Sequence, residues 1–339
     1  MAKLSDIANE VGVSNKTVSM TLRGIKCTSE ETSKRIFEVT ARIGYVPNQA
    51  ARDMRLQESH FIGLLADMVA TTPHTVELIR GAQAEAIENK RNLLVGTLDN
   101  DPDAPKEFMR MFQSHRAAGV IYATLYRRRL EQKLGNSALK VVMANCAATD
   151  HSAISVLPDD YGGGYLQGEK VLAMGHERIG VISLSNTAPA TAHRMKGIRT
   201  ALEDKGSTLN EALVREGIEG TPPSEQYVAY EVALDMLSQD NRPTAIICGN
   251  DRIAMLVYSA AARLKLMIPE DLSVVGFDNF TTISEGLRPA LTTIELPYFE
   301  MGRRAVRAVL NKDATNADEE TVPCTMIERD SCAPPRSLS

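Results

Sequence analysis

Residues 4–22 read LSDIANEVGVSNKTVSMTL, and this stretch predicts two short helices joined by a tight turn. Apolar residues recur with the period of one helix face up to Gly12, which ends the first helix. Ser5 is expected to cap this first helix, and Ser14 to cap a second helix that ends near residue 23. Two short helices around a glycine-containing turn are typical of a helix-turn-helix.

A third helix is predicted after this pair, which completes a small helical module. It begins at Thr28 or Ser29, continues to about Ile43, and ends at Gly44. A small bundle with polar outer faces has the same pattern, so the three helices alone do not establish a DNA-binding role.

The second helix carries the side chains that a DNA major groove requires. Asn15 and Lys16 lie in its first turn, where recognition helices meet base edges. Ser14, Thr17 and Ser19 are short hydrogen-bond donors that suit phosphate oxygens near a helix end. These five residues are the first candidates for DNA contacts.

The charge of the chain is unevenly distributed along its 339 residues. The formal net charge is −5, yet residues 1–57 hold nine Lys and Arg against six Asp and Glu. A small basic module joined to an acidic body is typical of a DNA reader with a separate sensing domain, although chance clustering produces the same counts.

Composition places the chain among ordinary globular proteins. No apolar run approaches the ~20 residues of a membrane span, and the first residues lack the apolar core of a signal peptide. The five cysteines are scattered, and neither CxxC nor HExxH occurs. We therefore expect a cytoplasmic protein with no membrane association, no cofactor and no bound metal.

Several short motifs, in this order, resemble the lactose-repressor (LacI/GalR) family of bacterial transcription regulators. Those of the headpiece lie at 4–8, 12–14, 17–19, 29–32 and 44–48, and those of the body at 175–180, 194–197, 243–246, 250–251, 268–278 and 289–294. The resemblance implies a DNA-binding headpiece over 1–46, a hinge helix and linker over 47–59, and an effector-binding and dimerisation core over 60–339.

The resemblance also implies DNA contacts at the end of the headpiece and in the hinge. The residues concerned are Tyr45, Asn48, Ala51, Met54 and Arg55. Met54 stands where the family usually has an intercalating leucine, so we expect an apolar wedge that unstacks a central base step. Because methionine is longer and more flexible than leucine, this wedge should be softer. Met54 as an ordinary linker residue is the alternative.

Met20 departs from the family, which often has an arginine at this place. Arginine pairs bidentately with guanine, whereas methionine reaches only apolar edges such as the thymine methyl group. We therefore expect an operator that differs from the commonest family consensus at that base. Lys26, just after the second helix, is a further candidate for a base or phosphate contact.

Beyond residue 59, strand-like runs alternate with amphipathic helices. Strands are expected at 60–67, 92–99, 119–124, 140–145, 154–157, 178–184, 245–249 and 273–278, with helices such as 75–90, 161–174, 191–205, 227–238 and 252–266 between them. This alternation predicts an α/β fold with parallel sheets covered on both faces, and the length suits two doubly wound lobes. The resemblance implies the periplasmic-binding-protein type, with an N-lobe at about 60–160 plus 291–322 and a C-lobe at about 161–290 plus 323–339.

The body carries no nucleotide-binding or nucleophile motif. The glycine triplet at 162–164 opens a helix, but its pattern fits no phosphate-binding fingerprint. Close packing at the start of that helix is the better explanation for the three glycines.

Two residues of the body are candidates for binding a small molecule. The resemblance matches Arg194 to the arginine that reaches the effector, and Asp251 to the aspartate beside it. A guanidinium and a carboxylate together can grip adjacent sugar hydroxyls as donor and acceptor. An interlobe salt bridge without any ligand is the alternative for this pair.

Three further positions are weaker candidates for the effector site. His74 lies where relatives often carry paired aromatics, Ser224 where some stack an aromatic, and Asn145 where purine-responsive members carry tryptophan. For His74, a surface position at a helix start is the alternative. Because the chain has no tryptophan, a weakly aromatic, polar cavity is expected, which favours a sugar or sugar acid over a stacked purine.

Together these features predict a repressor that binds double-stranded operator DNA and responds to an effector. A homodimer on a pseudo-palindromic operator is expected, because operator symmetry mirrors protein symmetry and the tail lacks heptads for a coiled coil. A regulator whose ligand strengthens DNA binding is the main alternative, and a solute-binding protein is a weaker one. No catalytic spacing is visible, so an enzyme is not expected.

Overall fold

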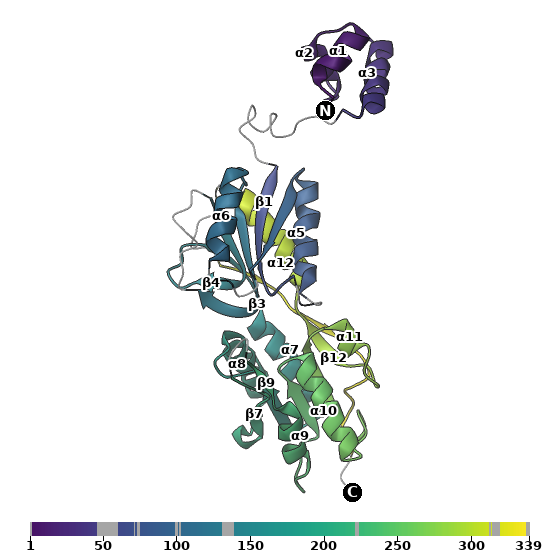
Figure 1. Ribbon diagram of the computed structural model, residues 1–339. Coiled ribbons are helices and arrows are strands. Elements are labelled where there is room, and N and C mark those ends of the chain that lie inside the picture. The colour runs from purple at the N-terminus through teal and green to yellow at the C-terminus, as the bar shows by residue number, and fades with distance from the viewer. Residues whose placement is uncertain are drawn as a thin grey trace. The chain divides into compact units, whose positions relative to one another are not determined.

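The computed structural model describes residues 2–45, 60–70, 72, 75–98, 101, 103–130, 139–220, 224–311, 313 and 319–336 (Figure 1). The chain divides into two compact units, residues 1–58 and 59–339, and each is described by itself. All five cysteines are described and are free thiols. Among the described residues, no helix is long and apolar enough to cross a membrane.

The first unit is a three-helix module. Its helices are α1 (Leu4–Val11), α2 (Asn15–Thr21) and α3 (Glu30–Ile43). Ile7, Val18 and Ile36, one from each helix, are fully buried and form the centre of its core. The predicted helix-turn-helix and the third helix are therefore confirmed.

Serine side chains begin two of these three helices, as predicted. Ser14 and Ser29 each accept a hydrogen bond from the backbone N–H three residues ahead, at 3.1 and 3.2 Å. The prediction for Ser5 is wrong, because this residue lies inside α1. The Asp6 carboxylate accepts the backbone N–H of Lys3 at 2.8 Å, and this contact starts the helix earlier than expected.

The N-lobe of the second unit is a parallel sheet in the strand order β13-β5-β4-β3-β1-β2. Its strands are β1 (Phe61–Asp67), β2 (Asn92–Thr97), β3 (Val120–Leu130), β4 (Val141–Ala148), β5 (Ile154–Pro158) and β13 (Glu319–Val322). Helices α5 (Val76–Glu88) and α12 (Tyr298–Leu310) cover one face, and α6 (Ala104–Ser114) covers the other. Because both faces are buried, β1 is apolar almost throughout.

The C-lobe has a second sheet in the order β14-β12-β11-β10-β6-β7. These strands are β6 (Ile179–Ser183), β7 (Val214–Glu216), β10 (Ala245–Cys248), β11 (Ser273–Asp278), β12 (Thr292–Glu295) and β14 (Thr325–Ile327). Helices α7 (Asp160–Ala173) and α8 (Pro189–Asp204) lie on one face, and α9 (Ala229–Leu237) and α10 (Asp251–Arg263) on the other. The remaining short elements are η1 (Glu211–Leu213), β8 (Ile218–Glu219), β9 (Gln226–Tyr227) and α11 (Thr281–Ser284).

The predicted α/β fold with two doubly wound lobes is confirmed, and two details differ from expectation. β14 joins the second sheet antiparallel to β12, so that sheet is mixed at one edge. The expected passage between the lobes at residue 291 comes later, because Thr292–Glu295 pairs in register with Val275–Asp278 of the C-lobe. The chain therefore passes between the lobes after β5, after β12 and after β13 (Figure 1).

The glycine triplet serves helix packing, as predicted. α7 lies close against α8, and a Cβ atom on Gly164 would be 2.2 Å from the backbone oxygen of Arg194. A Cβ on Gly163 would be 2.7 Å from the ring of Phe277. The missing side chains allow α8 to approach closely enough to place Arg194 beside the start of α7.

Gly164→Ala should lower the free energy of unfolding by about 1–3 kcal/mol, because a methyl group facing a backbone oxygen can be accommodated only by moving a helix. Urea unfolding of the full chain measures the loss. Gly168→Ala, one turn further along α7, is the control and should cost less, because its Cβ would lie 2.9 Å from the Ala201 methyl group and 3.1 Å from the Ile198 carbonyl oxygen, both longer than the 2.2 Å contact at Gly164. An equal loss from the two variants would contradict this account of the helix contact.

Candidate functional site

The first candidate surface is the N-terminal end of α2. Asn15 and Lys16 are exposed in its first turn. Ser14 is also exposed, but its Oγ accepts the backbone N–H of Thr17 and lies 2.9 Å from the Thr17 hydroxyl. The serine and threonine hydroxyls thus shape the helix start, which leaves Asn15 and Lys16 as the projecting side chains.

The other expected DNA contacts vary in exposure. Ser19 and Met20 are half-buried, and Lys26 is exposed. Tyr45 packs against the apolar core of the three-helix module. Asn48, Ala51, Met54 and Arg55 lie outside the described residues.

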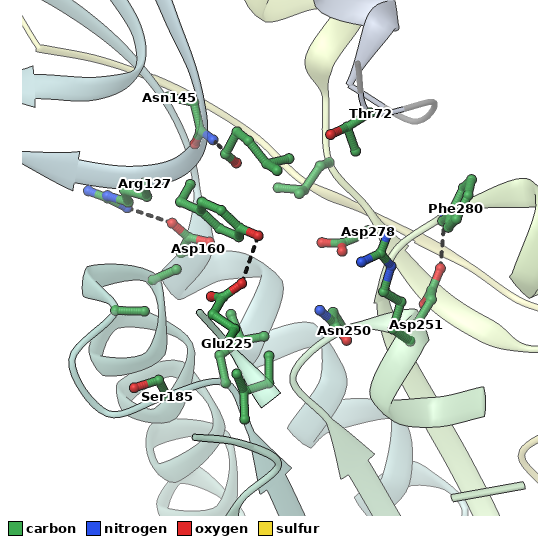
Figure 2. Close-up of a pocket in the computed structure, with 18 of the residues that line it drawn as sticks. Thr72, Arg127, Asn145, Asp160, Ser185, Glu225, Asn250, Asp251, Asp278 and Phe280 are labelled. Atoms are coloured by element: carbon green, nitrogen blue, oxygen red, sulfur yellow. Dashed lines mark hydrogen bonds and ion pairs between the residues drawn. The ribbon is translucent and has the colours of Figure 1, made fainter. Parts of the chain in front are cut away.

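The second candidate site is a cavity of about 230 Å³ between the two lobes of the second unit (Figure 2). It lies at the carboxyl ends of strands from both sheets, where doubly wound folds bind ligands. Its charged lining residues are Arg127, Asp160, Arg194, Glu225, Asp251, Arg252 and Asp278. This volume is smaller than the ~300–1,000 Å³ of sites for drug-sized ligands, so a small molecule fits best.

Arg194 reaches the cavity from α8, and its guanidinium is already held by protein groups. Nε donates to the Asp160 carboxylate at 2.9 Å, and NH1 donates to the Gly249 carbonyl at 2.6 Å. The guanidinium also stacks on Phe277, with its carbon 3.5 Å from the ring centroid. Burial opposes the charge, but the carboxylates of Asp160 and Asp278 outweigh it and raise the pKa of Arg194.

Asp160 is the centre of a buried ion triad that spans both lobes. It begins α7 in the C-lobe, and its side chain is fully buried. One carboxylate oxygen accepts from Arg194, and the other accepts from Arg127 of the N-lobe at 2.7 Å. Arg194 therefore lines the cavity and also pairs, within the C-lobe, with the aspartate that forms the interlobe salt bridge to Arg127.

Two aspartates in the floor of the cavity have different roles. Asp251 is 1% exposed, and its two oxygens accept the Thr293 hydroxyl at 2.6 Å and the backbone N–H of Phe280 at 2.7 Å. Asp278, at the end of β11, faces the cavity (Figure 2). Burial raises the pKa of Asp278 to about 7, although Arg194 lowers it. The oxygens of Asp251 are thus occupied by protein donors, whereas Asp278 presents its carboxylate to the cavity.

The expectation of a weakly aromatic cavity is wrong. Four aromatic side chains line it, and they are Tyr126, Tyr227, Phe280 and Tyr298. Tyr126 Oη donates to Glu225 Oε2 at 2.9 Å, and burial together with this carboxylate raises the pKa of the phenol. The aromatic residues come from four separate segments, so neither their spacing nor the absence of tryptophan indicated them.

Of the three weaker candidates for the effector site, one lines the cavity, one does not, and one lies outside the described residues. Asn145 lines the cavity, but its amide donates to the backbone carbonyls of Thr124 and Leu125. Ser224 is exposed and does not line the cavity. Its neighbour Glu225 lines the cavity and accepts the hydrogen bond from Tyr126. His74 lies outside the described residues.

Asp278 and Asp160 were missed, although a signal for Asp278 was present. The predicted strand 273–278 ends at Asp278, and the carboxyl ends of parallel strands are where such folds bind ligands. Asp160 directly precedes a predicted helix, and nothing in the sequence links it to two distant arginines. Among the described residues, no group of three His, Cys, Asp or Glu side chains is arranged to hold a metal ion.

Asp160→Asn should lower the free energy of unfolding by about 3–5 kcal/mol, because it leaves two largely buried guanidiniums without their shared carboxylate. Urea unfolding gives the size of the effect. Glu77→Gln, in the exposed Glu77–Arg80 pair, is the control and should cost under about 1 kcal/mol. Similar values for the two variants would show that the triad is no more important than a surface pair.

Comparisons with known proteins find matches to both units of the chain. Residues 3–48 match the family model described as bacterial regulatory proteins of the lacI family, and residues 169–332 match the periplasmic binding protein-like domain. The sucrose operon repressor of Escherichia coli is 30% identical over 97% of this chain and 99% of that protein. The transcriptional repressor PurR of Yersinia enterocolitica is 30% identical over 98% of this chain and 97% of that protein. The crystal structure of the lac repressor dimer bound to operator and an anti-inducer has a TM-score of 0.77 at 20% identity, over 98% of this chain and 99% of that chain.

Proposed function

This chain belongs to the LacI family of bacterial transcriptional repressors, which are not enzymes, and we propose that a sugar bound between its lobes controls its affinity for operator DNA. The observation that carries the sugar assignment is the cavity itself, in which the Asp278 carboxylate faces a space bounded by aromatic rings. Sugar hydroxyls donate to carboxylates, and the apolar C–H faces of a sugar ring suit aromatic faces.

The charges of the cavity favour an uncharged sugar over a sugar acid. Arg127 and Arg194 share the Asp160 carboxylate, so both guanidiniums already have a protein partner. Asp278 and Glu225 add negative charge on the surface of the cavity. Arg252 is a third cation in the lining, so three arginines face four carboxylates there. An anionic ligand therefore finds no excess of positive charge, whereas a neutral polyhydroxylated ligand needs none.

The DNA-binding half of the proposal rests on α2. Its exposed Asn15 and Lys16 suit base edges and phosphates in the major groove. Ser14, Thr17, Ser19, Met20, Lys26, Tyr45, Asn48, Ala51, Met54 and Arg55 stay predicted contacts. The relative crystallised on its operator is a dimer, and we infer a homodimer on a pseudo-palindromic site for this chain as well. Because a bacterial repressor binds operator DNA, we infer a cytoplasmic location for this chain.

A mobility-shift assay with the promoter DNA of its own gene tests the proposal, in the presence of neutral sugars, sugar acids or purine bases. A retarded complex that only a neutral sugar weakens or strengthens supports it, and the direction separates an inducer from a co-repressor. A response to a purine alone would overturn the sugar assignment. No retarded complex under any condition would overturn DNA binding at this operator.

Two substitutions in α2 should weaken operator binding in different ways. Asn15→Ala should cost about 1–3 kcal/mol and relax the preference at one base pair, because a base-edge contact is lost. Lys16→Ala should reduce affinity for all sequences and lower the slope of log affinity against log salt by about one unit per protomer if it contacts a phosphate. Lys106→Ala, in the second unit, is the charge-matched control and should change neither quantity.

Asp278 should make neutral-sugar binding depend on pH. The ionised carboxylate accepts hydroxyl donors, and a pKa near 7 leaves part of the population protonated at neutral pH. A bound sugar favours the ionised form, so affinity should rise as the pH increases from 6 to 8. Asp278→Asn should weaken binding roughly tenfold or more and flatten this pH profile. Calorimetry with the neutral sugar to which the mobility-shift assay responds measures both effects. An unchanged pH profile in the variant would exclude Asp278 as the responsible group.

A further inference from the structure

The inner end of β3 is irregular where it faces the cavity. Ala123 pairs with Ala144 of β4 and Arg128 pairs with Cys146, so residues 124–127 lie opposite the single residue Asn145. In a regular strand, successive side chains point to opposite faces of the sheet. A bulge removes this restriction and can direct neighbouring side chains to the same side.

This bulge is held in place by hydrogen bonds from two side chains. Asn145 Nδ2 donates to the Thr124 and Leu125 carbonyls at 3.1 and 2.8 Å. The Thr124 hydroxyl lies 2.9 Å from the Tyr126 carbonyl and 3.0 Å from the Asn145 carbonyl. Asn145 has a φ of 59°, a left-handed conformation that asparagine tolerates better than most residues.

As a consequence, two consecutive residues of the N-lobe reach the C-lobe. Tyr126 donates to Glu225 at 2.9 Å, and Arg127 donates to the buried Asp160 at 2.7 Å. Figure 2 shows the contacts of Asp160 and Glu225 as dashed lines among the residues that line the cavity. Both acceptors are carboxylates, so each contact is a charge-assisted hydrogen bond, which is stronger than a neutral one.

We propose that Tyr126–Glu225 and Arg127–Asp160 form an interlobe clamp that closes the lobes in the absence of any effector, and that Asn145 is its positioning residue. Asn145 acts on the clamp through the bulge that it holds, and not by contact with the effector. With this clamp, lobe closure does not require a ligand. An effector therefore shifts the balance between open and closed lobes by strengthening or breaking these two contacts. The inference does not depend on the chemical class of the effector.

Hydrogen–deuterium exchange of the effector-free, full-length protein tests the clamp. Tyr126→Phe removes only the phenolic oxygen, and it should speed exchange at residues 225–229 of the opposite lobe roughly tenfold. Tyr165→Phe is the matched control, because Tyr165 donates to Asp204 at 3.0 Å within the C-lobe. It should leave residues 225–229 unchanged. Exchange at 245–248, in the core of the C-lobe sheet, should stay unchanged in every variant.

A double variant tests the positioning role of Asn145. Asn145→Gly removes the amide but keeps the left-handed backbone accessible, and it should speed exchange at 225–229 about as much as Tyr126→Phe does. The two substitutions together should have little more effect than either alone, because they break the same contact. Additive effects would assign Asn145 a merely structural role. Unchanged exchange at 225–229 in Tyr126→Phe, or an equal increase in Tyr165→Phe, would overturn the clamp.

Discussion

The arrangement of the interlobe cavity depends on one buried carboxylate, that of Asp160. Arg194 of the same lobe and Arg127 of the N-lobe donate to its two oxygens, so the N-lobe guanidinium depends on the C-lobe for its counter-charge. The same contact fixes the direction in which Arg194 enters the cavity, and the close approach of α7 to α8 at Gly164 makes that contact possible. Packing, charge balance and site geometry are therefore linked through a single side chain.

Beside this ion triad, the cavity contains a carboxylate, that of Asp278, whose protonation can change near neutral pH. Asp278 lies near the midpoint of its titration at neutral pH, whereas Asp160 is locked between two cations. A ligand therefore meets one adaptable carboxylate in a wall that is otherwise preorganised. The cavity thus offers both hydrogen-bond acceptors and aromatic faces within about 230 Å³.

Local patterns predicted most of the fold because the responsible interactions are local. The serine caps of α2 and α3 and the apolar runs of the strands each depend on residues close in sequence. The predicted cap of α1 by Ser5 was wrong, because the Asp6 carboxylate accepts the backbone N–H of Lys3 and the helix begins before Ser5. The short strands β7, β8, β9, β13 and β14 have too few residues for a period to be visible.

The site was predicted less completely, because its members meet only in the folded chain. The family resemblance led to Arg194 and Asp251. Only the folded structure reveals that both oxygens of Asp251 accept hydrogen bonds from the protein, which makes Asp278 the better candidate for contact with a ligand. Tyr126 and Glu225 are 99 residues apart, and a bulge determines that they meet. No periodicity or motif in a single sequence reports such a contact.

The three passages between the lobes have a consequence for synthesis of the chain on the ribosome. The helical headpiece is contiguous, so it can fold as soon as it emerges. Neither lobe has this freedom, because β13 and β14 complete the edges of the two sheets and follow the other described strands in the chain. Until they emerge, β5 and β12 are open sheet edges, which are the surfaces most prone to pairing with another chain. The topology that builds a cavity between two lobes thus delays their completion until β14 has been translated.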